Sequence, residues 1–277
     1  MKVLVIGDVI DDVIVVPKGT IRPNTDTASR ISQTLGGSAG NIASWASFAG
    51  ADVTFIGCVN SKDVERVKQQ FDHYGVKVQL QKSNNATGTL VSLVEGSSRT
   101  MLTDRGANRD LDFSAIDNHH LAEFGFVFLS GYSIFENDVE VVNEFLTRVN
   151  SLGIKIMIDP GSAGFIKDYG IANFKSAIKH ADILLPNEDE FELLGSASKT
   201  TIVKKGSAEV ELYQDGALTD SFPVIGVQAI DPTGAGDSFS GTVLAHLANG
   251  ESLHHAINAG IANAALAVTT IGARPEL

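Results

Sequence analysis

The stretch Asp231-Pro-Thr-Gly-Ala-Gly-Asp237-Ser-Phe-Ser-Gly241 connects an apolar run, residues 224–230, to a long helical pattern. Gly234, Ala235 and Gly236 are small, so their backbone N–H groups can approach a ligand closely. The start of a helix leaves N–H donors unpaired and carries the positive end of the helix dipole. The stretch therefore predicts an anion-binding turn at the start of a helix.

Asp237 lies in the first turn of that expected helix, and a carboxylate there has two interpretations. In the first, it only stabilises the helix dipole. In the second, the N–H groups stabilise a transferring phosphoryl group while Asp237 takes the proton of the attacking hydroxyl. Glycine-rich turns at helix starts are common, but this eleven-residue string is far more specific and favours the second interpretation.

Short apolar, β-branched runs alternate with helical patterns along much of the chain. Strands are expected at residues 2–6, 53–56, 126–129, 154–158, 183–185 and 201–203, and helices at 38–48, 64–74, 139–152, 235–247 and 253–269. Strands that alternate with helices favour a parallel sheet covered on both faces. We expect an α/β fold, a three-layer sandwich with a mostly parallel central sheet.

Two segments interrupt this alternation, residues 13–35 and 86–103. Both contain strand-like runs joined by turn residues, with no helix between them, and residues 96–98 are typical of a hairpin tip. We expect these segments to form a small antiparallel β lid. The remaining residues, 1–12, 36–85 and 104–277, would then form the α/β core.

Charge, cysteine content and missing motifs exclude several classes of function. The formal net charge of −12 provides no basic face, so no nucleic-acid partner is expected. The single cysteine, Cys58, lies in an apolar stretch, which predicts a buried inert thiol. No run is long and apolar enough for a leader or a membrane span, so we expect no membrane partner and a cytoplasmic location. Neither G-x-x-x-x-G-K-[ST] nor a G-x-G-x-x-G after the first strand occurs, which argues against P-loop and dinucleotide-binding proteins.

Four motifs together resemble those of the ribokinase-like (phosphofructokinase-B) family of carbohydrate and nucleoside kinases. The stretch 231–241 is similar to the family's C-terminal signature, and Leu35-Gly-Gly-Ser-Ala-Gly-Asn41-Ile-Ala43 to its N-terminal glycine signature. Pro186-Asn187-Glu-Asp-Glu190 resembles its Asn-x-x-Glu motif, and residues 265–273, Ala-Leu-Ala-Val-Thr-Thr-Ile-Gly-Ala, its C-terminal end. Their order and spacing fit the family over nearly the whole chain. The resemblance implies the ribokinase-like fold and kinase activity.

The resemblance also implies a substrate site between the first strand and the glycine signature. The implied contacts are Asp12, Gly36, Gly37, Asn41 and Arg105. The glycines would let the backbone approach a sugar, whose hydroxyls would bond to Asp12 and Asn41. From the residues alone, Asn41 could equally be a helix cap or buried polar group, and Arg105 a surface residue or a salt-bridge residue. Ile10 stands where ribokinases carry asparagine, a departure that argues mildly against ribose.

On the nucleotide side, the resemblance implies ATP and Mg²⁺. The implied nucleotide contacts are Asn187, Lys204, Gly206 and Asn263, and Asn187 and Glu190 would hold Mg²⁺ through its waters. Alternatives are a helix capping box for Asn187 and Glu190, a solvated surface role for Lys204, and a helix-packing contact for Asn263. Many members bind a monovalent cation such as K⁺. Asp231 and Thr233 occupy the matching positions, although Glu276 stands where related kinases often have serine.

These observations predict an ATP-dependent phosphotransferase that phosphorylates a hydroxymethyl group of a small sugar. Asp237 would be the general base, and Gly234, Ala235 and Gly236 would form the anion hole. Open alternatives are a nucleoside or sugar-acid kinase of the same family and a non-catalytic sugar or nucleotide sensor, against which the intact Asp237 argues. Because bare apolar sheet faces are rare on monomers, we expect a homodimer through the lid, although a folded-down lid would give the same cover.

Overall fold

A nine-stranded sheet forms the body of the molecule in this computed structural model, which describes residues 1–95 and 98–277. Its strand order is β13-β12-β11-β10-β9-β8-β1-β4-β5, and the strands from β11 to β5 are parallel. The strands are β1 (Lys2–Ile6), β4 (Asp52–Asn60), β5 (Lys77–Ser83), β8 (Phe126–Ser130), β9 (Lys155–Asp159), β10 (Ile183–Leu184), β11 (Thr200–Lys204), β12 (Glu209–Gln214) and β13 (Ala217–Pro223). The expected mostly parallel sheet is confirmed.

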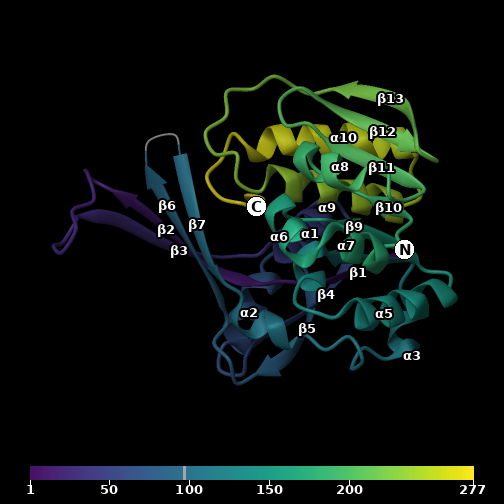
Figure 1. Cartoon of the computed structure of the whole chain (residues 1–277), viewed down its shortest axis with the longest axis horizontal. Coiled ribbons are helices and arrows are strands. Elements are labelled where there is room, and N and C mark those ends of the chain that lie inside the picture. Colours follow the sequence, from purple (N-terminus) through teal and green to yellow (C-terminus); the bar gives the residue numbers. More distant parts are fainter. Residues whose placement is uncertain (96–97) are drawn as a thin grey trace.

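Helices cover both faces of this sheet, which gives three layers (Figure 1). One face packs against α1 (Ser38–Phe48), α2 (Val64–Asp72), α9 (Ala235–Ala248) and α10 (Leu253–Ala267). The other packs against η1 (Gly106–Asp110), α3 (Asn118–Leu121), α4 (Gly131–Ile134), α5 (Val139–Ser151), α6 (Ala163–Tyr169), α7 (Ile171–Ala177) and α8 (Glu188–Leu194). Side chains alternate between the faces of a strand, so in β1 Val3 and Val5 join the first core, and Leu4 and Ile6 the second.

A second sheet of four strands stands apart from the body, as Figure 1 shows. Its order is β3-β2-β6-β7, with bounds β2 (Ile10–Pro17), β3 (Ser29–Gly36), β6 (Gly88–Glu95) and β7 (Ser98–Asp104). The expectation of a wholly antiparallel lid is wrong at one pairing, because β2 and β6 are parallel. The two strands follow the parallel strands β1 and β5, so both leave the same edge of the large sheet in one direction. Residues 96–97 of the expected hairpin tip lie outside the described residues, and the division of the chain into core and lid stays a prediction.

The antiparallel hairpin β12–β13 at the edge of the large sheet was not among the expected strands. Its turn is Asp215-Gly216, with φ of 47° and 86°. Asp-Gly between two alternating runs is a strong hairpin signal, because both residues tolerate positive φ. Separately, none of the helices in the described part of the chain is long and apolar enough to span a membrane.

Polar residues gather where the central parallel strands end. Asp8 follows β1, and Ser130, Asp159 and Lys204 are the last residues of β8, β9 and β11. In the sheet β1, β8 and β9 are adjacent, and β11 is separated from β9 by β10. Ligands of open α/β sheets bind outside the carboxyl ends of the strands. The fold therefore directs the search for a site to this edge, from which the lid strand β2 also departs.

Candidate active site

Asp8 holds the start of α1 in place from the end of β1. Its buried side chain accepts from the backbone N–H of Ser38 at 3.1 Å (Oδ2) and of Ala39 at 3.3 Å (Oδ1). Oδ1 also accepts from the Ser130 hydroxyl at 2.9 Å. A carboxylate is favoured at a helix start because it satisfies unpaired donors and the positive end of the dipole. Asp8 thereby fixes the turn of α1 that presents Ser38 and Asn41.

Asp237, in the first turn of α9, receives two hydrogen bonds from that turn of α1. The Ser38 hydroxyl donates to Oδ1 at 2.8 Å, and Asn41 Nδ2 donates to Oδ2 at 2.9 Å. Burial raises the pKa of Asp237 to about 7, and the hydrogen bonds from Asn41 and Ser38 partly offset this because they favour the ionised form. A pKa near neutrality suits a general base, which must be ionised at working pH and still hold a proton.

Arg274, near the C-terminus, joins the same network through Asn41. Its Nε donates to Asn41 Oδ1 at 3.2 Å, and Nη2 donates to the carbonyl oxygen of Gly36 at 3.4 Å. The guanidinium lies over the Phe71 ring, 4.8 Å from its centroid. Burial lowers the pKa of Arg274 to about 10, and Tyr74, like the carboxylates of Asp12 and Asp237, opposes this fall. Since Asn41 accepts from the guanidinium, its amide is turned so that its N–H group faces Asp237.

Gly36 and Gly37 stand where chain segments approach each other too closely for a side chain. A β-carbon at Gly37, whose φ is 90°, would lie 2.7 Å from the carbonyl oxygen of Asp8. A β-carbon at Gly36 would collide with the carboxylate of Asp12, which lies directly against this backbone. Burial raises the pKa of Asp12 to about 7, the neighbouring Asp8 raises it further, and Arg274 lowers it. The structure thus places Asp12 against the glycine segment, whose Gly36 carbonyl oxygen accepts from Arg274.

The turn before α9 has the shape expected of an anion site. Gly234 is left-handed, with φ of 78°, and a β-carbon there would lie 2.6 Å from the α-carbon of Ala273. Ala235 and Gly236 open the helix, where N–H groups lack intrahelical acceptors, although the Ala235 N–H makes a long bond of 3.4 Å to the Pro232 carbonyl oxygen. A β-carbon at Gly236 would lie 3.6 Å from Lys204 Nζ, so a cation stands beside this turn. Helix-start N–H groups next to an ammonium group favour a phosphate.

Lys204 is held at that position by two residues that the sequence analysis did not single out. Its Nζ lies 2.5 Å from Asp159 Oδ2 and 3.4 Å from Ser240 Oγ, and the Ser240 hydroxyl donates to the same Asp159 oxygen at 2.8 Å. Burial lowers the pKa of Lys204, but Asp159 and Glu190 outweigh burial, so the net pKa is raised. The ammonium therefore stays charged, and Lys204 is not the solvated surface residue that the alternative describes.

A cavity of about 420 Å³ opens beside the start of α9. Its polar lining includes Lys204, Gly206 and Ser207, and Ala235 and Gly236 also line it. The remaining walls are largely apolar and include Val210, Val224, Val227, Phe239, Ile261, Ala264 and Val268. Cavities of this size and character, with a few polar groups at one place, accommodate small molecules such as a nucleotide.

Asn187 and Glu190 form the capping box at the start of α8. Asn187 Oδ1 accepts from the Glu190 N–H at 2.9 Å, and the Glu190 carboxylate accepts from the Asn187 N–H at 2.8 Å and from Nδ2 at 2.9 Å. Burial raises the pKa of Glu190 to about 7, and Asp159 raises it further. Because both carboxylate oxygens are already bonded to Asn187, these residues fit a Mg²⁺ ion held through its waters better than direct coordination.

The remaining sequence candidates occupy other positions. Asp231 is buried and accepts from the N–H groups of Thr233 at 2.9 Å and Gly272 at 3.3 Å, so it braces the loop before α9. Arg105 is buried beside Asp8, 3.7 Å from its carboxylate, and lies over the Tyr132 ring. Arg105 also lies 3.8 Å from the Glu136 carboxylate, so it is a buried salt-bridge residue, which agrees with the salt-bridge alternative and excludes a surface position.

Asn263 lies between the last two helices. Its Nδ2 donates to Thr242 Oγ1 at 3.0 Å, a contact between helices that agrees with the helix-packing role considered for it above. Its neighbours Ile261 and Ala264 line the cavity.

The whole chain, residues 1–277, matches the family model described as pfkB family carbohydrate kinase. The chain belongs to this family. As a pfkB kinase it is an enzyme, a carbohydrate kinase, and the kinase fold described above agrees with that membership.

Curated pfkB relatives match most of this chain. A ribokinase from Haemophilus influenzae is 26% identical and covers 96% of this chain and 92% of its own length. An adenosine kinase from Saccharomyces cerevisiae is 27% identical over 86% of this chain and 78% of its own.

Solved structures share the fold. A ribokinase from Thermotoga maritima superimposes with a TM-score of 0.83 at 23% identity, covering 99% of this chain and 94% of that one. An E. coli protein provisionally assigned as ribokinase II, in complex with ATP and Mg²⁺, gives a TM-score of 0.85 at 22% identity, covering 98% and 94%.

Sequence reasoning missed several residues that the structure places in this candidate site. Ser38 lies within the glycine signature at the start of an expected helix, and Asp8 closely follows an expected strand, so each had a readable signal. Asp159 directly follows the strand expected at residues 154–158 and is the last residue of β9, the usual place for site residues in a parallel sheet. Arg274 carries no such signal, because its partner Asn41 is 233 residues away in the sequence.

Proposed function

We propose that this pfkB kinase transfers the γ-phosphoryl group of ATP to a hydroxymethyl group of a small sugar, with Asp237 as general base. One observation carries the proposal. The Asp237 carboxylate, with a pKa near 7, is held by Ser38 and Asn41 at the start of α9, where helix N–H groups stand beside Lys204. Deprotonation of a hydroxyl and neutralisation of a phosphate can therefore take place in one location.

In the proposed reaction, Asp237 accepts the proton of the substrate hydroxyl as the oxygen attacks the γ-phosphorus. The new O–P bond forms while the bond from that phosphorus to the bridging oxygen breaks, and ADP leaves with the electron pair. The N–H groups of Ala235 and Gly236 stabilise the charge on the phosphoryl oxygens. Asp12 and Asn41 orient the sugar by bonding its other hydroxyls.

ATP is proposed to occupy the cavity beside α9, with its base among the apolar walls and its phosphates toward Lys204 and Gly236. Support comes from the ATP and Mg²⁺ complex of the E. coli relative, which shares the fold. Mg²⁺ would neutralise phosphate charge, and Asn187 and Glu190 would hold its waters. A K⁺ ion near Asp231 and Thr233 remains part of the proposal.

The small sheet is proposed to act as a lid that excludes water from the transfer. Its strands expose large apolar side chains, with Ile31 at 62%, Met101 at 56% and Leu102 at 61%. Exposed apolar groups on a lid favour a partner surface. We propose that these side chains are covered in a homodimer that forms through the lid.

A sugar acid or phosphosugar is the second candidate for the substrate. Arg105 Nη2 and Arg274 Nη1 are buried and have no hydrogen-bond partner among the described residues. Other nitrogens of the two guanidinium groups face Asp8 and Asn41 respectively. A buried cationic donor without an acceptor is costly, and a substrate anion that displaces neighbouring side chains would satisfy it. This observation favours an acidic substituent on the sugar, whereas the adenosine kinase relative keeps nucleosides in consideration.

A coupled ADP-release assay with a panel of sugars, sugar acids, phosphosugars and nucleosides tests the proposal. The proposed function predicts substrate-dependent ADP release with at least one member of the panel, and a phosphomonoester product by mass spectrometry. Binding of panel members without any phosphorylated product, in the presence of ATP and Mg²⁺, would instead support the sensor alternative. A preference for neutral sugars over their acids would reject the second candidate.

A further inference from the structure

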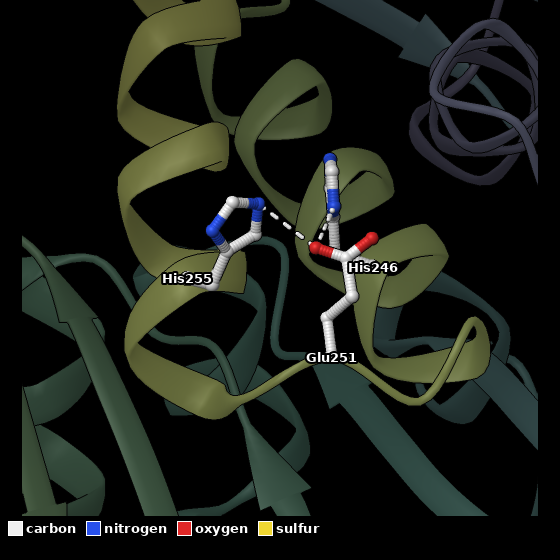
Figure 2. Close-up of side chains that lie close together, drawn as sticks. All are labelled: His246, Glu251 and His255. Atoms are coloured by element: carbon white, nitrogen blue, oxygen red, sulfur yellow. Dashed lines mark hydrogen bonds and ion pairs between the residues drawn. The ribbon is translucent and has the colours of Figure 1, made fainter.

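Three side chains of types that commonly bind metals, His246, Glu251 and His255, lie close together, as Figure 2 shows. They gather at the C-terminal end of α9, whereas Asp237 lies in its first turn. Glu251 Oε2 lies 2.9 Å from His246 Nδ1 and 2.8 Å from His255 Nε2. One ligand atom from each of the three residues lies within 4.8 Å of the others. We call this group the His-Glu-His cluster. The sequence analysis gave these residues no ligand role.

The backbone that carries the cluster is fixed by its own hydrogen bonds. His246 belongs to the last turn of α9, and its carbonyl oxygen accepts from the Glu251 N–H at 3.0 Å. Gly250, with φ of 85°, reverses the chain between them. Ser252 then caps α10 by accepting from the His255 N–H at 3.2 Å. The three side chains are therefore positioned by a helix–turn–helix unit and not by a long loop.

Two imidazoles and a carboxylate match the preferences of Zn²⁺ and related divalent transition metals. With bonds of about 2.1 Å, neighbouring ligands of a tetrahedral ion stand about 3.4 Å apart. Small side-chain movements would open the present separations of 2.8 and 2.9 Å to that value. The two histidines offer ring nitrogens within 4.8 Å of each other, so they too can reach this spacing by small movements. Three protein ligands leave the fourth position to water. From this geometry we infer that the His-Glu-His cluster binds one divalent transition-metal ion of the Zn²⁺ class.

The neighbouring His254 provides a matched control. Its Nε2 faces Asp220 Oδ2 at 3.2 Å, so it points to β13 and takes no part in the cluster. It is comparable to His255 in exposure, with 57% and 61% of the side chains accessible. A general effect of losing a surface histidine beside this turn would appear in His254→Ala as well as in His255→Ala.

The experiment is isothermal titration of the untagged protein with ZnCl₂, with excess Mg²⁺ present to occupy oxygen-ligand sites elsewhere. The inference predicts one Zn²⁺ per chain in the wild type and in His254→Ala. It predicts affinity at least about tenfold lower in His246→Ala and in His255→Ala, since loss of even an outer partner of a metal ligand costs that much. Zn²⁺ should also raise the Tm of the wild type and His254→Ala.

Tm measurements without metal show whether each variant is folded, and Glu251→Gln supplies a second test that keeps both imidazoles. Equal affinity in the wild type and the three cluster variants would mean an adventitious ion elsewhere, and would overturn the inference. Failure of the wild type to bind Zn²⁺ at micromolar concentration would overturn it too. ADP release without added Zn²⁺ should be unchanged in all variants, because the cluster lies outside the proposed active site.

Discussion

The Ser38 hydroxyl is predicted to set the pH range in which the kinase works. It donates to Asp237 Oδ1 at 2.8 Å and so favours the ionised carboxylate. Ser38→Ala removes this donor while it preserves the helix, because alanine is the best helix former. The pKa of Asp237, now about 7, should therefore rise.

The size of the effect follows from the strength of the bond. A hydrogen bond to a charged group contributes about 1.5–3 kcal/mol, and 1.36 kcal/mol corresponds to about one pH unit. We take the lower figure because Asp237 is only partly shielded from solvent. The acidic limb of the kcat/KM profile should then move up by about one pH unit. At pH 7 the ionised fraction would fall from about one half to about one tenth, so kcat/KM would drop by roughly fivefold.

The assay is kcat/KM against pH from 5.5 to 9.5, with the best substrate of the panel. Ser38→Ala should recover most of its activity at pH 9, since the carboxylate is then ionised in both proteins. Ser44→Ala is the matched control, because Ser44 lies on the same helix and its hydroxyl donates within that helix, to the Gly40 carbonyl oxygen at 3.0 Å. A Ser38→Ala profile with the wild-type midpoint, or an equal loss at every pH, would refute the reasoning.

Two further predictions concern the groups around the same carboxylates. Arg274→Gln removes a cation that favours the ionised forms of Asp12 and Asp237, so their pKa values should rise and the acidic limb should move up by about one unit. Arg274→Lys keeps a positive charge and should move the acidic limb part of the way back to its wild-type position. An unchanged pH profile in Arg274→Gln would contradict this prediction. Gly36→Ala places a β-carbon against the Asp12 carboxylate, so the KM for the sugar should rise by about tenfold, as for a lost charge-assisted bond, with little change in the KM for ATP. Gly164→Ala, which adds a β-carbon in ordinary contact, should leave both KM values unchanged.

The parts of the fold that local patterns determine were predictable from the sequence. The expected helix at residues 38–48 and strand at residues 2–6 have the same bounds in the structure, because each begins and ends at a clear change in pattern. The parallel pairing of β2 with β6 was not predictable in this way, since it depends on which edge of the large sheet the chain leaves.

In the candidate site too, local sequence patterns were predictable and tertiary contacts were not. The glycine signature and the stretch 231–241 identify Asn41 and Asp237 locally, but only the fold shows that they are joined by a hydrogen bond. Arg274 depends entirely on tertiary contact with Asn41, and the Asp159–Lys204 pair joins two strands that are separated by β10. The sequence therefore predicts which segments contain the candidate catalytic and binding residues. The charged and polar partners that shift the pKa values of those residues are identified only from the folded structure.

Turnover of Asp237→Asn tests the central claim most directly. Asparagine keeps the size of the side chain but cannot take a proton, so kcat should fall by about 10²–10⁴, the usual cost of losing a general base. ATP and sugar affinities, measured by titration calorimetry, should stay close to those of the wild type. Near-normal kcat in a folded Asp237→Asn protein would show that another group removes the proton, and the proposed mechanism would be wrong.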